Sequence, residues 1–94
     1  MIDDKEDIKL RFAICLQKAI ADKEMTLRGL AASSGLEYTN VQRASVGEVN
    51  IALSTIIALA EGLNISPSKL FQYYEKVGQN EVNNFKEEKK RKKK

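Results

Sequence analysis

The fold is decided by residues 25–71, which read MTLRGLAASSGLEYTNVQRASVGEVNIALSTIIALAEGLNISPSKLF. Glycines 35 and 47 and the Ser66-Pro67 pair divide this stretch into short segments whose apolar residues recur at helical spacing. No segment alternates apolar and polar residues for long enough to form a strand. The stretch therefore predicts consecutive short helices joined by tight turns, in an all-α domain.

Local signals set the expected helix boundaries. Thr26 is a good N-cap for the next helix, and Gly35 can end that helix in a left-handed conformation. Ser66 followed by Pro67 marks the start of a later helix, which Gly78 is expected to end. The acidic residues near the N-terminus suit the beginning of the first helix. The sequence thus predicts five helices, over residues 4–23, 27–34, 38–45, 52–63 and 67–77.

The segment 38–45 is the most informative of these helices. Val41 is its one strongly apolar residue apart from Ala44, so the helix must pack on its neighbours through a narrow face. The rest of its surface is expected to stay exposed, namely Tyr38, Thr39, Asn40, Gln42 and Arg43. A helix buried on one side and polar on the other can enter the major groove of DNA, which is about 12 Å wide.

A set of ordered features runs through residues 8–74. These are Thr26-Leu27-Arg28-x-Leu30-Ala31, Ser34-Gly35-Leu36, Val41, Gly47, Asn50, Ile56-x-x-Leu59-Ala60-x-x-Leu63, Ile65-Ser66-Pro67 and Leu70-Phe71. Together they resemble the phage-repressor family of helix-turn-helix proteins (Cro, lambda repressor and the XRE type), which includes controller proteins of restriction–modification systems. The resemblance implies a five-helix, lambda-repressor-like domain that binds double-stranded DNA.

The resemblance also implies roles for particular residues. Contacts to base edges would come from Tyr38, Thr39 and Arg43, and an arginine can bond guanine through two hydrogen bonds. Phosphate contacts set the register of a protein on DNA. They would come from Thr26, Asn40, Gln42, Asn50 and the backbone of Gly47.

Three positions depart from the family pattern. Leu27 stands where many members carry a glutamine that binds phosphate, so this chain cannot make that interaction. Ile20 and Ser45 stand where many members pair an arginine with a glutamate. Losing one partner would strand a buried charge at a cost of several kcal/mol, whereas losing both leaves a consistent apolar substitute. The fold is expected to survive these changes.

The helices at 52–63 and 67–77 carry more apolar surface than a small domain needs. One recognition helix reads only a few base pairs, whereas a twofold pair can read half-sites about 34 Å apart. The sequence therefore predicts a homodimer. Its interface would include Ile57, Phe71, Tyr73 and Tyr74. The alternative is that the aromatic residues simply close the core of the monomer.

Charge divides the chain into two parts. Residues 86–94 hold seven basic and two acidic residues, while residues 1–85 hold nine basic and eleven acidic ones. We expect a helix-turn-helix domain over 1–78 and a polar, basic tail over 79–94. The tail is either disordered or a partial helix that lays Val82 and Phe85 over Leu10 and Ile14, which otherwise need cover from another subunit. It could serve as a solubilising end, an arm for DNA or RNA, or a nuclear-localisation signal.

Several functional classes are disfavoured by composition. There is no histidine and one cysteine, so histidine acid–base chemistry, the usual zinc sites and an internal disulfide are excluded. No cofactor or metal is expected. Cys15 is either a small buried hydrophobe or a reactive thiol. No apolar run reaches the roughly 18 residues of a membrane span, and the chain reads as cytoplasmic.

The leading hypothesis is a sequence-specific transcriptional regulator, a repressor or controller, that binds DNA as a homodimer. The alternative is a protein-interaction module on the same fold, such as an antitoxin or adaptor. The acidic folded part and the single basic residue of segment 38–45 favour that alternative. An enzyme is not expected, because no nucleophile–base pair or metal constellation is present.

Overall fold

The computed structural model describes residues 4–92, which form six α-helices and no strand. The helices are α1 (Lys5–Asp22), α2 (Leu27–Ser34), α3 (Tyr38–Ser45), α4 (Leu53–Gly62), α5 (Pro67–Lys76) and α6 (Gln79–Lys92). The all-α class is as expected, but the count of five helices is wrong, because residues assigned to a polar tail form α6. Within residues 4–92 no helix is both long and apolar enough to cross a bilayer.

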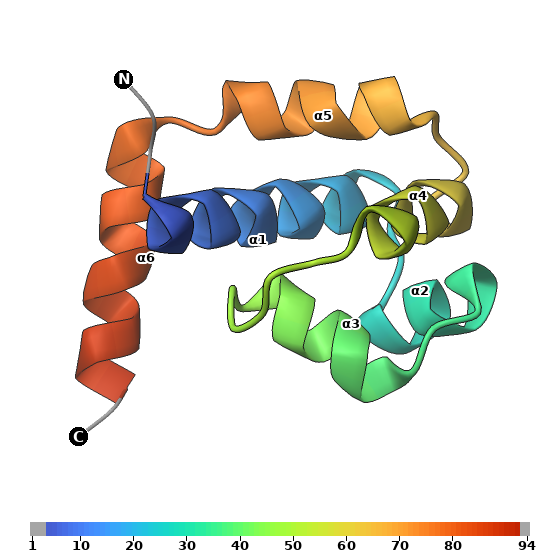
Figure 1. Cartoon of the computed structure of the whole chain (residues 1–94), viewed down its shortest axis with the longest axis horizontal. Helices are drawn as coiled ribbons and strands as arrows, with labels where there is room; N and C mark the ends of the chain where they lie inside the picture. Colours follow the sequence, from blue (N-terminus) through green and yellow to red (C-terminus); the bar gives the residue numbers. More distant parts are fainter. Residues whose placement is uncertain (1–3, 93–94) are drawn as a thin grey trace.

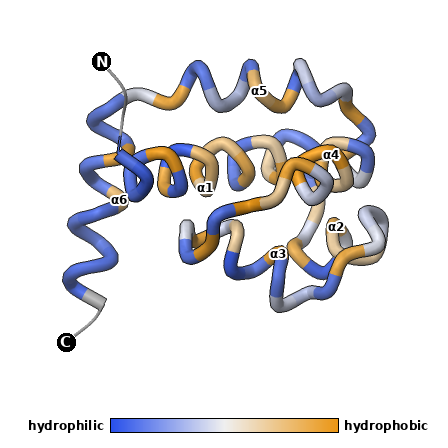
Figure 2. Tube along the Cα trace, viewed as in Figure 1, coloured by the Kyte–Doolittle hydropathy of each residue, from blue (hydrophilic) through white to orange (hydrophobic). Residues whose placement is uncertain are grey.

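The long helix α1 lies at the centre of the molecule (Figure 1). In that view α5 runs along one side of α1, α2 and α3 lie on the other, and α6 crosses the N-terminal end of α1. Apolar stretches concentrate in α1 and α4, whereas α6 is hydrophilic over most of its length (Figure 2). The largest fully buried side chains come from all six helices and the residue after α4: Leu10, Cys15, Leu16, Leu30, Val41, Leu59, Leu63, Leu70 and Val82.

The helix caps predicted for α2 and α5 are confirmed. The Thr26 hydroxyl accepts a hydrogen bond from the Gly29 amide at 2.9 Å, and the Ser66 hydroxyl accepts one from the Lys69 amide at 3.1 Å. Gly35 ends α2 with a φ of 74°, in the left-handed region. Short-range chemistry therefore sets both ends of α2 and the start of α5.

Gly78 has a different role from the one predicted. It does not adopt the left-handed conformation of a helix-ending glycine, and α5 ends instead at Val77 in an extended conformation. The Gly78 amide donates to Glu81 Oε2 at 2.9 Å, which satisfies one of the donors left unpaired at a helix start. Gly78 therefore directly precedes α6 and contributes to capping its start.

The C-terminal segment covers the apolar residues of α1 that needed a partner. Val82 of α6 is fully buried, and Phe85 packs against the same core cluster. Leu10 and Ile14 are buried beside them, so a second subunit is not required to cover them. Ile8, near the start of α1, is 40% exposed.

Cys15 lies in the core. Its Sγ is 3.6 Å from the Leu70 carbonyl oxygen, and the residue is fully buried. Burial disfavours the thiolate and raises the pKa of Cys15 to about 12. The residue is therefore a small buried hydrophobe, and the alternative of a reactive thiol is wrong for the folded chain.

Candidate nucleic-acid interface

α2 and α3 form a helix-turn-helix that two other helices hold in place. Ser33 Oγ of α2 donates to the Gly62 carbonyl at the end of α4, over 2.9 Å. Gln17 Nε2 of α1 donates to the Ser45 carbonyl at the end of α3. The turn between α2 and α3 begins at Gly35, whose left-handed φ allows the chain to reverse within a few residues. The two short helices are thus fixed by tertiary contacts.

The inner face of α3 is made by Val41, Ala44 and Ser45, all buried. Ser45 and Ile20 occupy the two positions where the family often places a charged pair, and both are buried and uncharged. The Ser45 hydroxyl donates to the Gln42 carbonyl at 2.7 Å, so its polar group is satisfied within α3. The expectation that this pair of substitutions is compatible with the fold agrees with this packing.

The outer face of α3 gathers the residues predicted to read DNA. Thr39, Asn40, Gln42 and Arg43 are exposed and Tyr38 is half-buried. On a helix these five residues cover the arc opposite the buried ones. The structure therefore brings together all three predicted base-contacting residues and two of the predicted phosphate-contacting residues on one helix face.

Arg28 belongs to the same surface, although sequence analysis did not single it out. Its guanidinium carbon lies 4.1 Å from the centroid of the Tyr38 ring, in a cation–π contact between α2 and α3. Arg28 is exposed, so the contact holds a second positive charge next to the start of α3. The sequence signal that could have identified this contact is an arginine in the first turn of α2 together with a tyrosine at the start of α3.

Arg43 forms an ion pair with Glu48. Its Nε lies 3.9 Å from Glu48 Oε1, and the two side chains are 50% and 54% exposed. Ion pairs this open to water contribute little to stability. The side chain of Arg43 is therefore able to exchange this partner for another acceptor at small cost.

Three predicted phosphate-contacting residues lie along the edge of the helix-turn-helix. Thr26 is exposed at the start of α2, and Asn50 is exposed in the loop between α3 and α4. Asn40 and Asn50 both line a shallow pocket of about 270 Å³ beside α3. Asn40 and Asn50 therefore share one hollow next to the outer face of α3.

Gly47 differs from these exposed residues, and its phosphate contact stays a prediction. The residue is buried, with a left-handed φ of 77°, and its amide already donates to the Ala44 carbonyl at 3.3 Å. A Cβ atom at this position would lie 2.7 Å from Leu10 Cδ2. Glycine is required here because the chain leaves α3 against α1 in a conformation that excludes a side chain.

Two of the four predicted dimer residues lie on one apolar surface. Phe71 and Tyr74 of α5 stack edge to face with ring centroids 6.3 Å apart. Together with Ile8, Ile51 and Ile56 they line an open hollow of about 290 Å³. We call these five residues the Phe71 surface. Both Phe71 and Ile8 are 40% exposed, which is high for large apolar side chains.

The other two predicted dimer residues lie outside the Phe71 surface. Ile57 is half-buried in α4 and does not line the hollow. The Tyr73 hydroxyl donates to Asp22 Oδ2 at 2.7 Å, and this hydrogen bond raises the pKa of Tyr73. Tyr73 thus joins α5 to the end of α1 within one molecule.

Comparisons with known proteins agree with this geometry. A family profile described as the Cro/C1-type HTH DNA-binding domain matches residues 15–76. A solved structure of a point mutant of the restriction–modification controller protein C.Esp1396I superposes with a TM-score of 0.70. That likeness covers 73% of this chain and 87% of the controller protein, at 22% sequence identity, and therefore concerns the fold. No curated protein sequence matches the chain.

Proposed function

The chain belongs to the Cro/C1-type helix-turn-helix DNA-binding family, and from that premise we propose that it is a sequence-specific regulator of transcription. It binds double-stranded DNA as a homodimer and reads the major groove with α3. A role as repressor or controller is supported by the family and by the likeness to a controller protein in fold.

One observation carries the proposal: the outer face of α3 is polar and exposed, while the buried residues of its inner face hold the helix on the domain. Thr39 and Arg43 lie one helical turn apart on that arc, and both are exposed. Arg43 can donate two hydrogen bonds to guanine, and Thr39 can offer its hydroxyl or its methyl group to a base edge. Arg28, held on the ring of Tyr38, adds a charge that can contact phosphate next to these groups.

Selection of bound sites from a pool of random duplex DNA tests this function directly. A twofold dimer should enrich inverted repeats whose half-sites lie about 34 Å apart, one turn of DNA. Recovery of a repeat supports both reading by α3 and the dimer. Recovery of sequences no different from the starting pool would contradict sequence-specific binding.

The Phe71 surface is the dimer interface in this proposal, and its occupant is the same surface of a second copy. A single α3 reads too few base pairs for useful specificity, so a twofold pair is needed. An apolar hollow that includes two 40%-exposed residues supports the assignment. In sedimentation equilibrium, Phe71→Glu should be monomeric where the wild type is dimeric. The control variant Lys76→Glu changes an exposed residue of the same helix and should remain dimeric. If Phe71→Glu is dimeric as well, the interface lies elsewhere.

An antitoxin or adaptor on the same fold is the second candidate. Its support is the low positive charge of the recognition surface, where Glu37 and Glu48 accompany Arg28 and Arg43. Binding to duplex DNA releases counterions, so its affinity falls steeply with salt. A fluorescence anisotropy titration that detects no salt-dependent binding to any duplex would favour this candidate.

A further inference from the structure

α6 lies beyond the family match, which ends at residue 76, yet it is firmly attached to the domain. Its apolar contacts are Val82, which is fully buried against the core, and Phe85, which is partly buried there. Lys18 Nζ of α1 lies 2.7 Å from Glu81 Oε1, and Lys86 forms an ion pair with Asp7 near the start of α1. α6 is therefore fixed in orientation at two points along its length.

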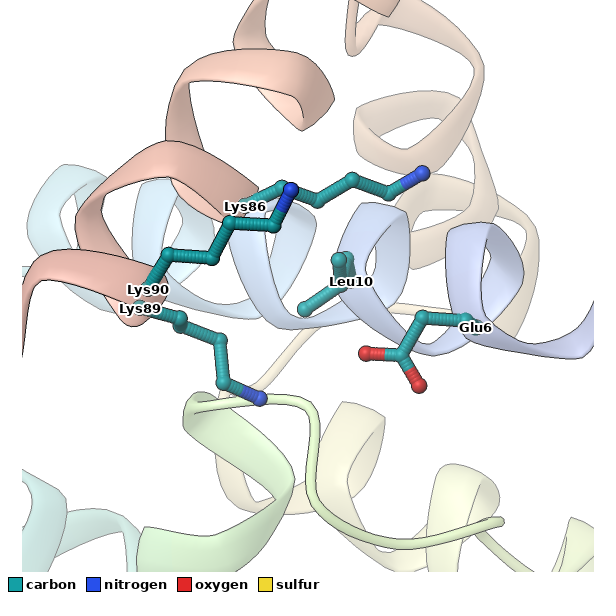
Figure 3. Close-up of a pocket in the computed structure, with 5 residues that line it drawn as sticks. All are labelled: Glu6, Leu10, Lys86, Lys89 and Lys90. Carbon is teal, nitrogen blue, oxygen red and sulfur yellow. The ribbon is translucent and has the colours of Figure 1, made fainter. Parts of the chain in front are cut away.

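The basic end of α6 reaches the end of α3. Lys89 Nζ lies 3.3 Å from the carbonyl oxygen of Val46, the residue that caps the C-terminus of α3. Lys86, Lys89 and Lys90 surround Leu10 in a hollow of about 220 Å³, with Glu6 opposite them (Figure 3). A carbonyl at a helix C-terminus carries partial negative charge, so a lysine is well placed there.

The basic residues of α6 fall into two groups: some contact the rest of the domain, and others are exposed to solvent. Its residues 79–92 include five basic and three acidic ones. Lys86 and Lys89 are used in contacts with α1 and the end of α3, whereas Lys90 and Arg91 are exposed and make no ion pair among the described residues. Figure 1 shows the C-terminal end of α6 on the same side of α1 as α3.

From this arrangement we propose that Lys90 and Arg91, at the end of the docked α6, form a second phosphate-binding surface for DNA, adjacent to α3 and outside the helix-turn-helix. The proposal rests on the proposed DNA-binding function and adds a partner surface to it. The contact is to the sugar–phosphate backbone, because exposed cations at the edge of the domain attract phosphate without distinguishing bases.

Electrostatics explains why such a surface is useful in this chain. Residues 1–85 carry an excess of two negative charges, so the rest of the domain adds little attraction for phosphate. Cations held by a docked helix lose less conformational freedom on binding than those on a flexible tail. The docking contacts of α6 therefore lower the entropic cost of binding phosphate with Lys90 and Arg91.

The test is a salt titration by fluorescence anisotropy, with one duplex that carries a selected site and one scrambled duplex. The double variant Lys90→Gln/Arg91→Gln should weaken binding to both duplexes by the same factor. The slope of log affinity against log salt should fall by about 0.9 for each phosphate that the variant no longer neutralises, or about 2 if both side chains bind DNA. The control Lys69→Gln/Lys76→Gln removes the same charge from α5, which lies across α1 from α3, and should leave the slope unchanged.

Each outcome is decisive. A fall in slope confined to the α6 variant supports the proposal. An unchanged slope in that variant, or an equal fall in the control, overturns it while leaving DNA binding by α3 intact. A change in preference between the two duplexes would mean that α6 reads bases and would also overturn it. If the wild-type protein binds neither duplex, the result contradicts the proposed DNA-binding function, and this inference fails with it.

Discussion

α3 and α6 are both too polar to be stable alone, but the protein holds them by different forces. α3 is held mainly by buried side chains, with Val41 as its principal anchor. α6 has one fully buried apolar residue, Val82, beside the partly buried Phe85. It depends also on polar contacts: the ion pairs of Asp7 and Glu81, the Arg11–Gln79 hydrogen bond and the Lys89 contact with the end of α3. Apolar packing depends much less on ionic strength and on acid than ion pairs do, because salt screens the charges and acid protonates the carboxylates. The attachment of α6 should therefore respond to solution conditions that leave α3 unchanged.

The largest effect on stability should come from replacing the buried valine of each helix with a charged residue. Val41→Asp buries a carboxylate between α3 and the core and should lower the free energy of unfolding by about 4 kcal/mol or more. Val82→Asp should release α6 but leave a cooperative transition for the remaining helices. Thermal unfolding followed by circular dichroism measures both. Equal loss of structure in the two variants would mean that α6 is part of the same cooperative unit as α3.

A smaller effect, confined to binding, is expected from the exposed face of α3. Arg43→Ala should weaken binding to the selected DNA site by about tenfold to a hundredfold, the value of one bidentate guanine contact. The melting temperature should stay nearly constant because the Arg43–Glu48 pair is exposed and weak. Anisotropy and thermal unfolding provide the two readouts, with Lys76→Ala as the matched surface change. Unchanged affinity in Arg43→Ala would show that Arg43 does not read DNA.

The smallest effect is expected from acid, and it should be seen in α6 alone. The hydrogen bond with Lys86 lowers the pKa of Asp7, and that with Lys18 lowers the pKa of Glu81, from ordinary values of 3.8 and 4.5. Each carboxylate therefore stabilises the docked helix above its ordinary pKa, and this stabilisation is lost as the pH falls through the lower folded value.

Backbone amide shifts measured by NMR from neutral to acidic pH test this expectation. Signals from α6 should move toward values typical of an undocked segment below the ordinary pKa of Asp7, while those from α3 stay in place. The variant Asp7→Asn/Glu81→Gln, which has neither titrating group, should lose this transition. Simultaneous changes in α3 and α6 would contradict the separation of the two helices.

The difference between α2–α3 and α6 also explains which features could be predicted from the sequence. The caps at Thr26 and Ser66 and the turn at Gly35 are local, so the sequence around them is sufficient to identify them. The exposed arc of α3 follows from its helical periodicity around Val41. These signals predict the helix-turn-helix and the residues of its outer face without knowledge of the packing.

What could not be predicted depends on residues far apart in the chain. α6 has few apolar residues, and its docking requires Lys18 and Asp7, which lie more than sixty residues away from their partners. Burial of Gly47 depends on where Leu10 packs, and the Arg28–Tyr38 stacking joins two helices. Helical periodicity carries no information about such pairs. It left a partial helix and disorder as alternatives for the tail, and the ion pairs that dock α6 and the cation beside α3 appear only in the structure.

The position of Cys15 has a practical consequence for measurements on this protein. Its thiol is fully buried and, with a pKa of about 12, remains protonated at neutral pH. A maleimide dye reacts with thiolates that it can reach, so the native chain should take up label very slowly. A new cysteine at an exposed site such as Ser68 could therefore be labelled selectively without removing the natural one. A single fluorophore on α5 would then report assembly of two copies by energy transfer.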